Sequence, residues 1–153
     1  MRIAIAADHA GLTLKRDIAR LLGEMQLPYE DFGTDSEGSV DYPDYAARVA
    51  HGVADGEFDR GILICGTGIG MAIAANKVAG VRAAPVTDLD TARLSREHND
   101  ANVLALGARF LGRERALEIV RIFLETPFAG GRHERRVQKI AALETDRDAD
   151  SRP

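Results

Sequence analysis

The chain has 153 residues, of which 45% are hydrophobic and 29% are charged, and its formal net charge is -4. This length and balance predict one soluble globular domain, and the acidic charge disfavours nucleic acid as a partner. The apolar runs are shorter than the roughly 18 residues of a membrane span, and the one at the N-terminus is too short for a secretory signal. A single cysteine excludes an intramolecular disulfide, so we expect a cytoplasmic protein.

Short apolar stretches alternate with amphipathic stretches along the chain. The apolar stretches predict strands at residues 2–7, 27–32, 61–65, 81–86 and 103–106. The amphipathic stretches predict helices over residues 12–25, 45–54, from the loop after residue 65 to about 78, 89–97, 112–126, and from about 132 onward. Residues 33–44 read as a loop. Asp88 is expected to cap the helix over 89–97. Pro127 is expected to end the helix over 112–126.

This alternation predicts an α/β domain in which a parallel sheet is covered by helices on both faces. We expect one domain over residues 1–145 and a polar, frayed tail over residues 146–153. In such folds the ligand binds beyond the carboxyl ends of the strands. That rule directs attention to four strand ends, which carry Asp8-His9, Cys65 to Gly68, Thr87-Asp88 and Gly107 to Arg109.

The sequence CGTGIG, residues 65–70, connects a predicted strand to a predicted helix. It is not a Walker loop, because Ala72 stands where that loop needs lysine, and Met71 stands where a dinucleotide fingerprint needs its third glycine. A variant fingerprint with Asp88 as the ribose contact stays open. The glycines let backbone N–H groups approach an anion at the positive end of a helix, which suits a phosphate, a carboxylate or an enediolate. A tight turn without a ligand is the alternative.

Cys65 ends the most apolar strand at the mouth of this loop. A helix N-terminus favours the thiolate, which is the reactive form of cysteine and can act as nucleophile or general base. The alternative is a small buried hydrophobic residue. At the end of the first strand, Asp8 and His9 could orient a sugar hydroxyl and contact an anion, unless Asp8 only caps the helix that follows.

Basic and polar residues surround the fifth strand and begin the last helix. His98 and Asn99 precede the strand and Arg109 follows it, while Arg132 and Arg136 are spaced to share one face of a helix. Two arginines on one face can bind a phosphate. A solvated helix end and a solvated basic face are the alternatives. The histidines show no metal-ligand spacing, so we expect no metal site.

Five motifs occur in order: ADHAG, DYPDYA, CGTGIGMAIAANK, EHNDANVLALGAR and GGRHERRV. Together they resemble the type B ribose-5-phosphate isomerases, a family that includes galactose-6-phosphate isomerase subunits and allose-6-phosphate isomerases. The resemblance runs from about Arg2 to about Leu143. It implies a Rossmann-like three-layer α/β/α sandwich with a five-stranded, mostly parallel sheet. It also implies a homodimer, or a tetramer, with active sites shared between subunits and no metal or organic cofactor.

The resemblance also implies roles for individual residues. Cys65 matches the general base, because Met71 occupies the position at which another subgroup carries a glutamate base. His98 matches the acid/base that opens the furanose ring. The anion hole matches Gly66, Thr67, Gly68, Ile69 and Gly70, with the Thr67 hydroxyl assisting. The hydroxyl-binding residues match Asp8 and Asn99, and the phosphate-binding residues match His9, Arg109, Arg132 and Arg136.

We therefore expect an aldose–ketose isomerase that interconverts ribose 5-phosphate and ribulose 5-phosphate through an enediolate. Such a reaction needs a base for a carbon-bound proton, donors for the developing oxyanion and a clamp for the phosphate. The same chemistry on allose 6-phosphate, galactose 6-phosphate or a tetrulose 4-phosphate is the alternative, with Tyr42 and Tyr45 as candidates for the pocket wall. A second alternative is a module that binds a sugar phosphate without catalysing a reaction. Nucleic acid and membranes are not expected partners.

Overall fold

The computed structural model describes the chain from residue 1 to residue 150, with side chains described to residue 145. Within that range the chain forms one five-stranded sheet in the order β2-β1-β3-β5-β4, and all four strand pairings are parallel. The strands are β1 (Ile3–Ala7), β2 (Tyr29–Asp31), β3 (Arg60–Cys65), β4 (Ala83–Pro85) and β5 (Val103–Gly107). The helices are α1 (Leu12–Glu24), α2 (Tyr42–Ala54), α3 (Ile69–Ala75), α4 (Leu89–Glu97), α5 (Arg113–Glu125) and α6 (Arg132–Asp150), with a short 3-10 helix η1 (His9–Gly11) before α1.

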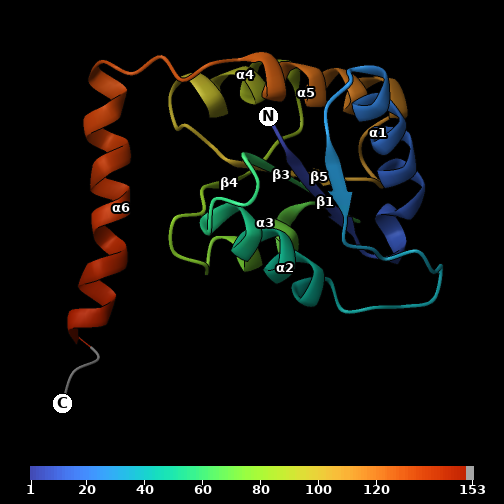
Figure 1. The fold of residues 1–153 in the computed structure, drawn as a ribbon, viewed down its shortest axis with the longest axis horizontal. Coiled ribbons are helices and arrows are strands. Elements are labelled where there is room, and N and C mark those ends of the chain that lie inside the picture. Colours follow the sequence, from blue (N-terminus) through green and yellow to red (C-terminus); the bar gives the residue numbers. More distant parts are fainter. Residues whose placement is uncertain (151–153) are drawn as a thin grey trace.

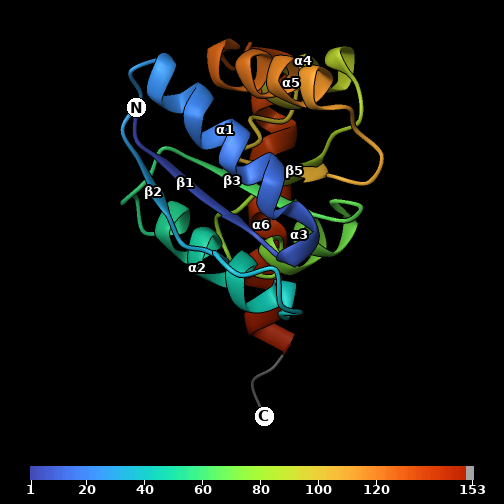
Figure 2. The ribbon, with the colours of Figure 1, turned by 90° about the vertical axis from the view of Figure 1, so that its right-hand side faces the viewer.

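Helices cover the sheet on both faces (Figures 1 and 2). Helices α1, α4 and α5 pack on one face, where their apolar residues form one core cluster with Ile62 and Ile64 of β3. Helices α2 and α3 pack on the other face, where Leu63 and Cys65 of β3 point. Because the strand is buried on both faces from Gly61 onward, its residues from Ile62 to Cys65 are all apolar, and each fully buried Ile or Leu contributes about 1.5–3 kcal/mol. The predicted three-layer α/β/α sandwich is confirmed.

Most predicted elements are confirmed, and the differences lie at edges and ends. The carboxylate of Asp88 accepts a hydrogen bond from the backbone N–H of Thr91 at 2.8 Å, so the predicted cap is confirmed. Helix α2 starts at Tyr42, inside the stretch predicted as a loop, because Pro43 suits the first turn of a helix. Strands β2 and β4 have three residues each, fewer than predicted, because each pairs with one neighbour only.

Helix α6 stands beside the sheet rather than on either face of it (Figure 1). The carboxylate of Glu144 accepts a hydrogen bond from the backbone N–H of Gly80 at 2.9 Å, while Ile140 and Leu143 are 44% and 63% exposed. The predicted polar tail is helical to Asp150, and residues 151–153 lie outside the described range. None of the helices within residues 1–150 is long and apolar enough to cross a bilayer.

Candidate active site

The carboxyl ends of the three central strands, β1, β3 and β5, meet at one edge of the sheet. The backbone N–H of Asp8 donates to the carbonyl of Ile64 at 3.1 Å, and that of Arg109 donates to the carbonyl of Gly66 at 3.1 Å. These bonds continue the strand pairing beyond the sheet. They place three predicted site segments, after β1, after β3 and after β5, next to one another.

The loop after β3 encloses the cysteine. Cys65 is 5% exposed, and its Sγ accepts a hydrogen bond from the backbone N–H of Gly68 at 3.1 Å. Gly68 has a φ of +78°, in the left-handed region, which favours glycine. The Thr67 side chain is exposed, and its Oγ1 accepts from the N–H of Ile69 at 3.1 Å. The loop thus directs a backbone donor at the sulfur.

This loop rests directly on the end of β5, backbone against backbone. A Cβ at Gly107 would lie 2.6 Å from the carbonyl oxygen of Thr67, and one at Gly68 would lie 3.0 Å from the carbonyl carbon of Leu106. Real Cβ atoms do not approach so closely, so the contact depends on glycine at position 107. A loop held in this way has a fixed backbone, and fixed donors are what an oxyanion site requires.

Asp8 and His9 lie beside the loop with several of their polar atoms already engaged. Oδ1 of Asp8 accepts from the N–H groups of Ala10 at 3.0 Å and Gly11 at 3.1 Å, so the capping alternative is confirmed for this oxygen. Nδ1 of His9 accepts from the N–H of Val40 at 3.2 Å. Because an accepting ring nitrogen carries no proton, the neutral ring has its proton on Nε2, which is left to donate to a ligand.

Two further side chains border the loop. The exposed guanidinium of Arg109 lies over Gly66, where a Cβ would be 3.1 Å from Nη1. The ring of Tyr42 lies against Gly70, where a Cβ would be 2.6 Å from Cζ. Arg109 therefore brings a positive charge to the loop and Tyr42 forms a wall beside it. Tyr45 is placed differently, with its ring near Gly33.

Four predicted site residues lie at the opposite edge of the sheet. His98 and Asn99 follow the end of α4 and precede β5, where the carbonyl of Asn102 accepts from the N–H of Gly61 near the start of β3. The ring of His98 stacks on that of His133, with centroids 4.1 Å apart and planes at 14°. This stack brings the start of α6, and with it Arg132 and Arg136, to the same edge.

The predicted site is therefore divided within one chain, across the length of β5, which spans about 13 Å at the usual rise per residue. We call the residues beyond the strand ends the carboxyl-edge group: Asp8, His9, Cys65, Gly66 to Gly70, and Arg109. We call the residues at the start of β5 and of α6 the amino-edge group: His98, Asn99, Arg132 and Arg136. The first group holds most of the predicted site residues, and the second lies at the other edge because α4 ends where β5 begins.

The amino-edge group is strongly cationic. Partial burial lowers the pKa of His133 from its usual 6.5, and the positive charges of His98, Arg132 and Arg136 lower it further, against a smaller opposing effect of Glu97. His133 was not among the predicted site residues. Asn99 lines a hollow of about 260 Å³ between β4 and α6, which Ile140 also borders. Neither feature involves Cys65, so one chain alone does not assemble all of these residues around one ligand.

No group of three or more His, Cys, Asp or Glu side chains within the described part of the chain is arranged to hold a metal ion. The two groups contain a thiol, a carboxylate, imidazoles, guanidiniums and backbone amides. Together these can transfer a proton, stabilise an oxyanion and bind a phosphate.

A parallel α/β sandwich with a thiol, an amide-lined loop and a separate cationic group defines a protein that acts on a small anionic molecule. The ribose/galactose isomerase family model matches residues 3–140, and the chain belongs to this family. It is 50% identical to the protein of Escherichia coli named ribose-5-phosphate isomerase B, over 96% of this chain and 99% of that one.

Solved structures agree with this assignment. The chain is similar to the ribose-5-phosphate isomerase B of Clostridium thermocellum, with a TM-score of 0.94 and 54% identity over 95% of this chain and 99% of that one. It is also similar to the ribose-5-phosphate isomerase B of Mycoplasma genitalium, solved with bound ribulose 5-phosphate, with a TM-score of 0.92 and 47% identity over 94% and 96% of the two chains.

Proposed function

We propose that the protein is an aldose–ketose isomerase that interconverts ribose 5-phosphate and ribulose 5-phosphate through an enediolate. The observation that carries this proposal is the Cys65 thiol, whose sulfur accepts a hydrogen bond from Gly68 inside a loop built of backbone donors. The relative from Mycoplasma genitalium, which has bound ribulose 5-phosphate, supports the choice of substrate.

Cys65 is the general base in this proposal. Its thiolate removes the proton from C2 of the open-chain aldose, and the electron pair moves to the carbonyl oxygen O1 to give the enediolate. The resulting thiol then returns the proton to C1, while the proton of the C2 hydroxyl passes to O1, so that O1 becomes a hydroxyl and the ketose carbonyl forms at C2. Backbone N–H groups of residues 66–70 and the Thr67 hydroxyl stabilise the negative charge on O1 and O2. The buried Met71 carries no carboxylate that could replace the thiol in this role.

The remaining site residues prepare and hold the sugar. His98 transfers the proton that opens the furanose ring, and Asp8 and Asn99 bind sugar hydroxyls. The phosphate is bound by His9, Arg109, Arg132 and Arg136, whose charge-assisted hydrogen bonds are the strong kind. Binding energy from this non-reacting phosphate orients the reacting carbons near Cys65.

These roles require two subunits, because the carboxyl-edge and amino-edge groups lie at opposite edges of one sheet. A two-fold dimer places the amino-edge group of each subunit against the carboxyl-edge group of the other, and so builds two identical shared sites. Exposed apolar side chains are available for such contacts, Ile69 and Ile73 on α3 and Ile140 and Leu143 on α6. A tetramer built from two such dimers is compatible with the same site.

We place this reaction in the cytoplasm, where a reducing compartment keeps the single free thiol of Cys65 intact. Residues 1–145 serve as the one catalytic domain, and residues 146–153 are its polar tail. The proposal includes no metal, organic cofactor, nucleic acid or membrane partner.

A comparison of kcat/KM for ribose 5-phosphate, allose 6-phosphate, galactose 6-phosphate and erythrose 4-phosphate tests the proposal. We expect the pentose phosphate to have the highest value. The family description names galactose as well as ribose, so the same chemistry on a hexose phosphate is the second candidate, and a higher rate on a hexose phosphate would select it. Binding of these compounds without turnover would establish a sugar-phosphate-binding module instead.

A further inference from the structure

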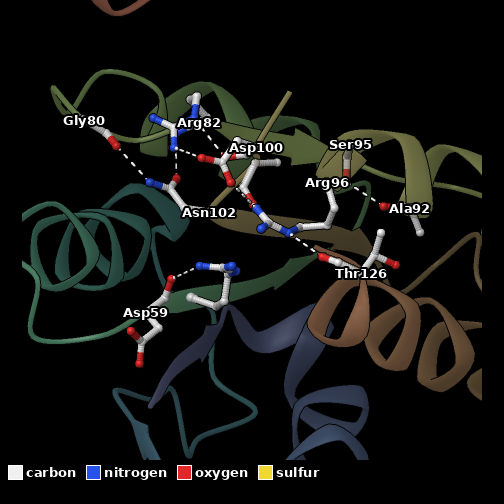
Figure 3. Close-up of polar contacts among 11 residues, drawn as sticks. Asp59, Gly80, Arg82, Ala92, Ser95, Arg96, Asp100, Asn102 and Thr126 are labelled. Atoms are coloured by element: carbon white, nitrogen blue, oxygen red, sulfur yellow. Dashed lines mark hydrogen bonds and ion pairs between the residues drawn. The ribbon is translucent and has the colours of Figure 1, made fainter. Parts of the chain in front are cut away.

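The turn that carries His98 and Asn99 is fixed by the next residue, Asp100. Its φ of +46° lies in the left-handed region, which is uncommon for a residue other than glycine. Nη1 of Arg96 donates to its carboxylate at 2.9 Å, and Nη2 of Arg82 pairs with it at 3.3 Å. The Nε of Arg82 also donates to the backbone carbonyl of Asp100 at 2.9 Å. Figure 3 shows both guanidiniums directed at Asp100, so its side chain and its main chain are both held.

Arg96 extends this contact to a second segment. It is 2% exposed, and its Nη1 also donates to the carbonyl of Ala101 at 2.6 Å. Its Nε donates to the carbonyl of Thr126 at 3.2 Å, as Figure 3 shows. Thr126 follows α5 and begins the connection to α6, and three residues later the N–H of Ala129 donates to the carbonyl of Glu97 at 3.1 Å. One buried guanidinium thus joins the His98 turn to the segment that leads to Arg132 and Arg136.

Positive charges outnumber negative charges around Arg96, which does not suit a residue whose only role is to stabilise the fold. Arg96 and Arg82 share the carboxylate of Asp100. Burial lowers the pKa of Arg60, and the positive charge of Arg96 lowers it further. Among the residues whose side chains the structure describes, the buried Nε of Arg60 has no hydrogen-bond partner. Apolar side chains of similar volume often stabilise a fold as well as a buried ion pair does. What the arginine provides and an apolar residue does not is a fixed geometry between two segments.

We propose that Arg96 and Asp100 are positioning residues for the amino-edge group. They hold the His98–Asn99 turn and the segment before α6 in one fixed arrangement. The ring-opening imidazole and the phosphate-binding guanidiniums of one subunit then enter the partner's site as a unit. This inference rests on the proposed function, since it assigns the task that the arrangement serves.

Two variants and one control test it. Asp100→Asn keeps the shape and tolerates the left-handed backbone, but it loses the charge that both arginines share. Arg96→Lys keeps the charge but cannot contact Asp100, Ala101 and Thr126 together. Arg93→Lys is the control, because Arg93 lies on the same helix and pairs with Glu97 at 2.7 Å at the surface. A surface pair contributes little, so we expect the control to stay within about twofold of wild type.

We expect kcat/KM for ribose 5-phosphate to fall about 10- to 100-fold in both variants, because misplaced catalytic and binding groups reduce the rate to this extent. Asp100→Asn lowers mainly kcat, because it loosens the His98 turn. Arg96→Lys also raises KM and the inhibition constant of inorganic phosphate, because it loosens the segment that carries the arginines. A merely structural role would lower kcat only in proportion to the folded fraction, with KM and phosphate inhibition unchanged, and that result would overturn the inference.

Amide hydrogen exchange provides a second measurement that does not depend on catalysis. The N–H groups of Asp100, Ala101 and Ala129 report the two held segments, and we expect their exchange to accelerate at least about tenfold in both variants, with the core strands unchanged. Wild-type exchange at these amides in both variants would also overturn the inference. Should the wild-type protein fail to isomerise ribose 5-phosphate, the proposed function is wrong. Hydrogen exchange alone then decides whether Arg96 and Asp100 hold the two segments together.

Discussion

The imidazole rings of His98 and His133 lie face to face, with centroids 4.1 Å apart and planes 14° from parallel. Partial burial is the main reason why the pKa of His133 is lowered, and the charges of His98, Arg132 and Arg136 act in the same direction. His133 therefore stays neutral at pH values at which an ordinary histidine takes up a proton. A neutral ring can stack on His98 without adding charge to a group that is already cationic.

The lowered pKa of His133 predicts a pH dependence of stability. The unfolded chain binds a proton at His133 near pH 6.5, whereas the folded chain does so only at lower pH. The unfolded state therefore gains protons first, so the free energy of unfolding falls as the pH drops below 6.5 and recovers as the pH rises. We expect His133→Phe, which keeps an aromatic face, to flatten this dependence in urea unfolding at pH 5 and pH 7. The exposed His51 offers the control variant His51→Gln, and an equal flattening there would contradict the assignment to His133.

Replacing Cys65 tests the base. Cys65→Ala removes the sulfur and leaves the phosphate-binding residues intact, so we expect kcat to fall about 10²- to 10⁴-fold, the usual contribution of general acid–base catalysis, with KM little changed. Cys65→Ser keeps an acceptor for the N–H of Gly68 but is a far weaker acid, so it should be nearly as inactive. Steady-state kinetics check both variants. Near wild-type turnover by Cys65→Ala would show that another group is the base.

Gly107→Ala tests the contact between the loop and β5. The added methyl group would meet the carbonyl oxygen of Thr67 at 2.6 Å, so the backbone has to shift at a cost of about 1–3 kcal/mol. The shift moves the oxyanion donors, and kcat should fall more than KM rises. Gly23→Ala in α1 is the control, because within the described part of the chain its Cβ would meet no heavy atom within 4 Å beyond its chain neighbours and its own helix backbone, and a helix gains about 0.5–1 kcal/mol from this change. Thermal unfolding and kinetics measure both variants, and equal behaviour would argue against a rigid loop.

Arg136→Ala tests the phosphate clamp. Loss of charge-assisted hydrogen bonds costs about 1.5–3 kcal/mol, so we expect KM for ribose 5-phosphate to rise roughly 10- to 100-fold, with a smaller change in kcat. The neighbouring Arg135 is also exposed and lies outside the proposed clamp, so Arg135→Ala is the matched control and should leave KM unchanged. Equal effects of the two variants would mean that general positive charge, and not a specific contact, attracts the substrate.

Mixing two inactive variants tests the shared site. Cys65→Ala damages only the carboxyl-edge group, and His98→Asn damages only the amino-edge group. When equal amounts exchange subunits, each mixed dimer has one site with both groups intact, so about a quarter of all sites should recover activity. The measurement is kcat per subunit after reassortment. Failure to recover activity, despite mass-spectrometric proof of mixed dimers, would place both groups in a site within one chain.

Much of the fold follows from local patterns. Strand β3 is apolar from Ile62 to Cys65 because both of its faces are covered there, and Asp88 is a recognisable cap because it directly precedes helix α4 and accepts from an N–H of its first turn. Helix α2 begins three residues earlier than predicted, because Tyr42 and Pro43 lie in a polar stretch that is typical of a loop. The packing of the Tyr42 ring against Gly70 is a tertiary contact that the local sequence does not indicate. The short edge strand β4 could not be delimited, because flanking residues such as Val86 are buried as well.

The candidate site was only partly predictable. The rule about strand ends found Cys65 and Arg109, because Cys65 ends one central parallel strand and Arg109 lies just beyond the end of another. The same rule could have excluded His98 from that edge, since it directly precedes β5. Arg96 gave no signal, because an arginine in an amphipathic helix is normally solvated, and its burial follows from its contacts with Asp100, Ala101 and Thr126 in the folded chain.

The separation of the two groups across one sheet has a consequence for populations of mixed chains. In the proposed dimer, a chain with Cys65→Ala still supplies a working amino-edge group to its partner, so activity falls in direct proportion to the wild-type fraction. A chain with both Cys65→Ala and His98→Asn inactivates both sites of every dimer that it enters, so activity falls with the square of that fraction. Such a doubly altered chain is a dominant-negative inhibitor, whereas neither single variant is.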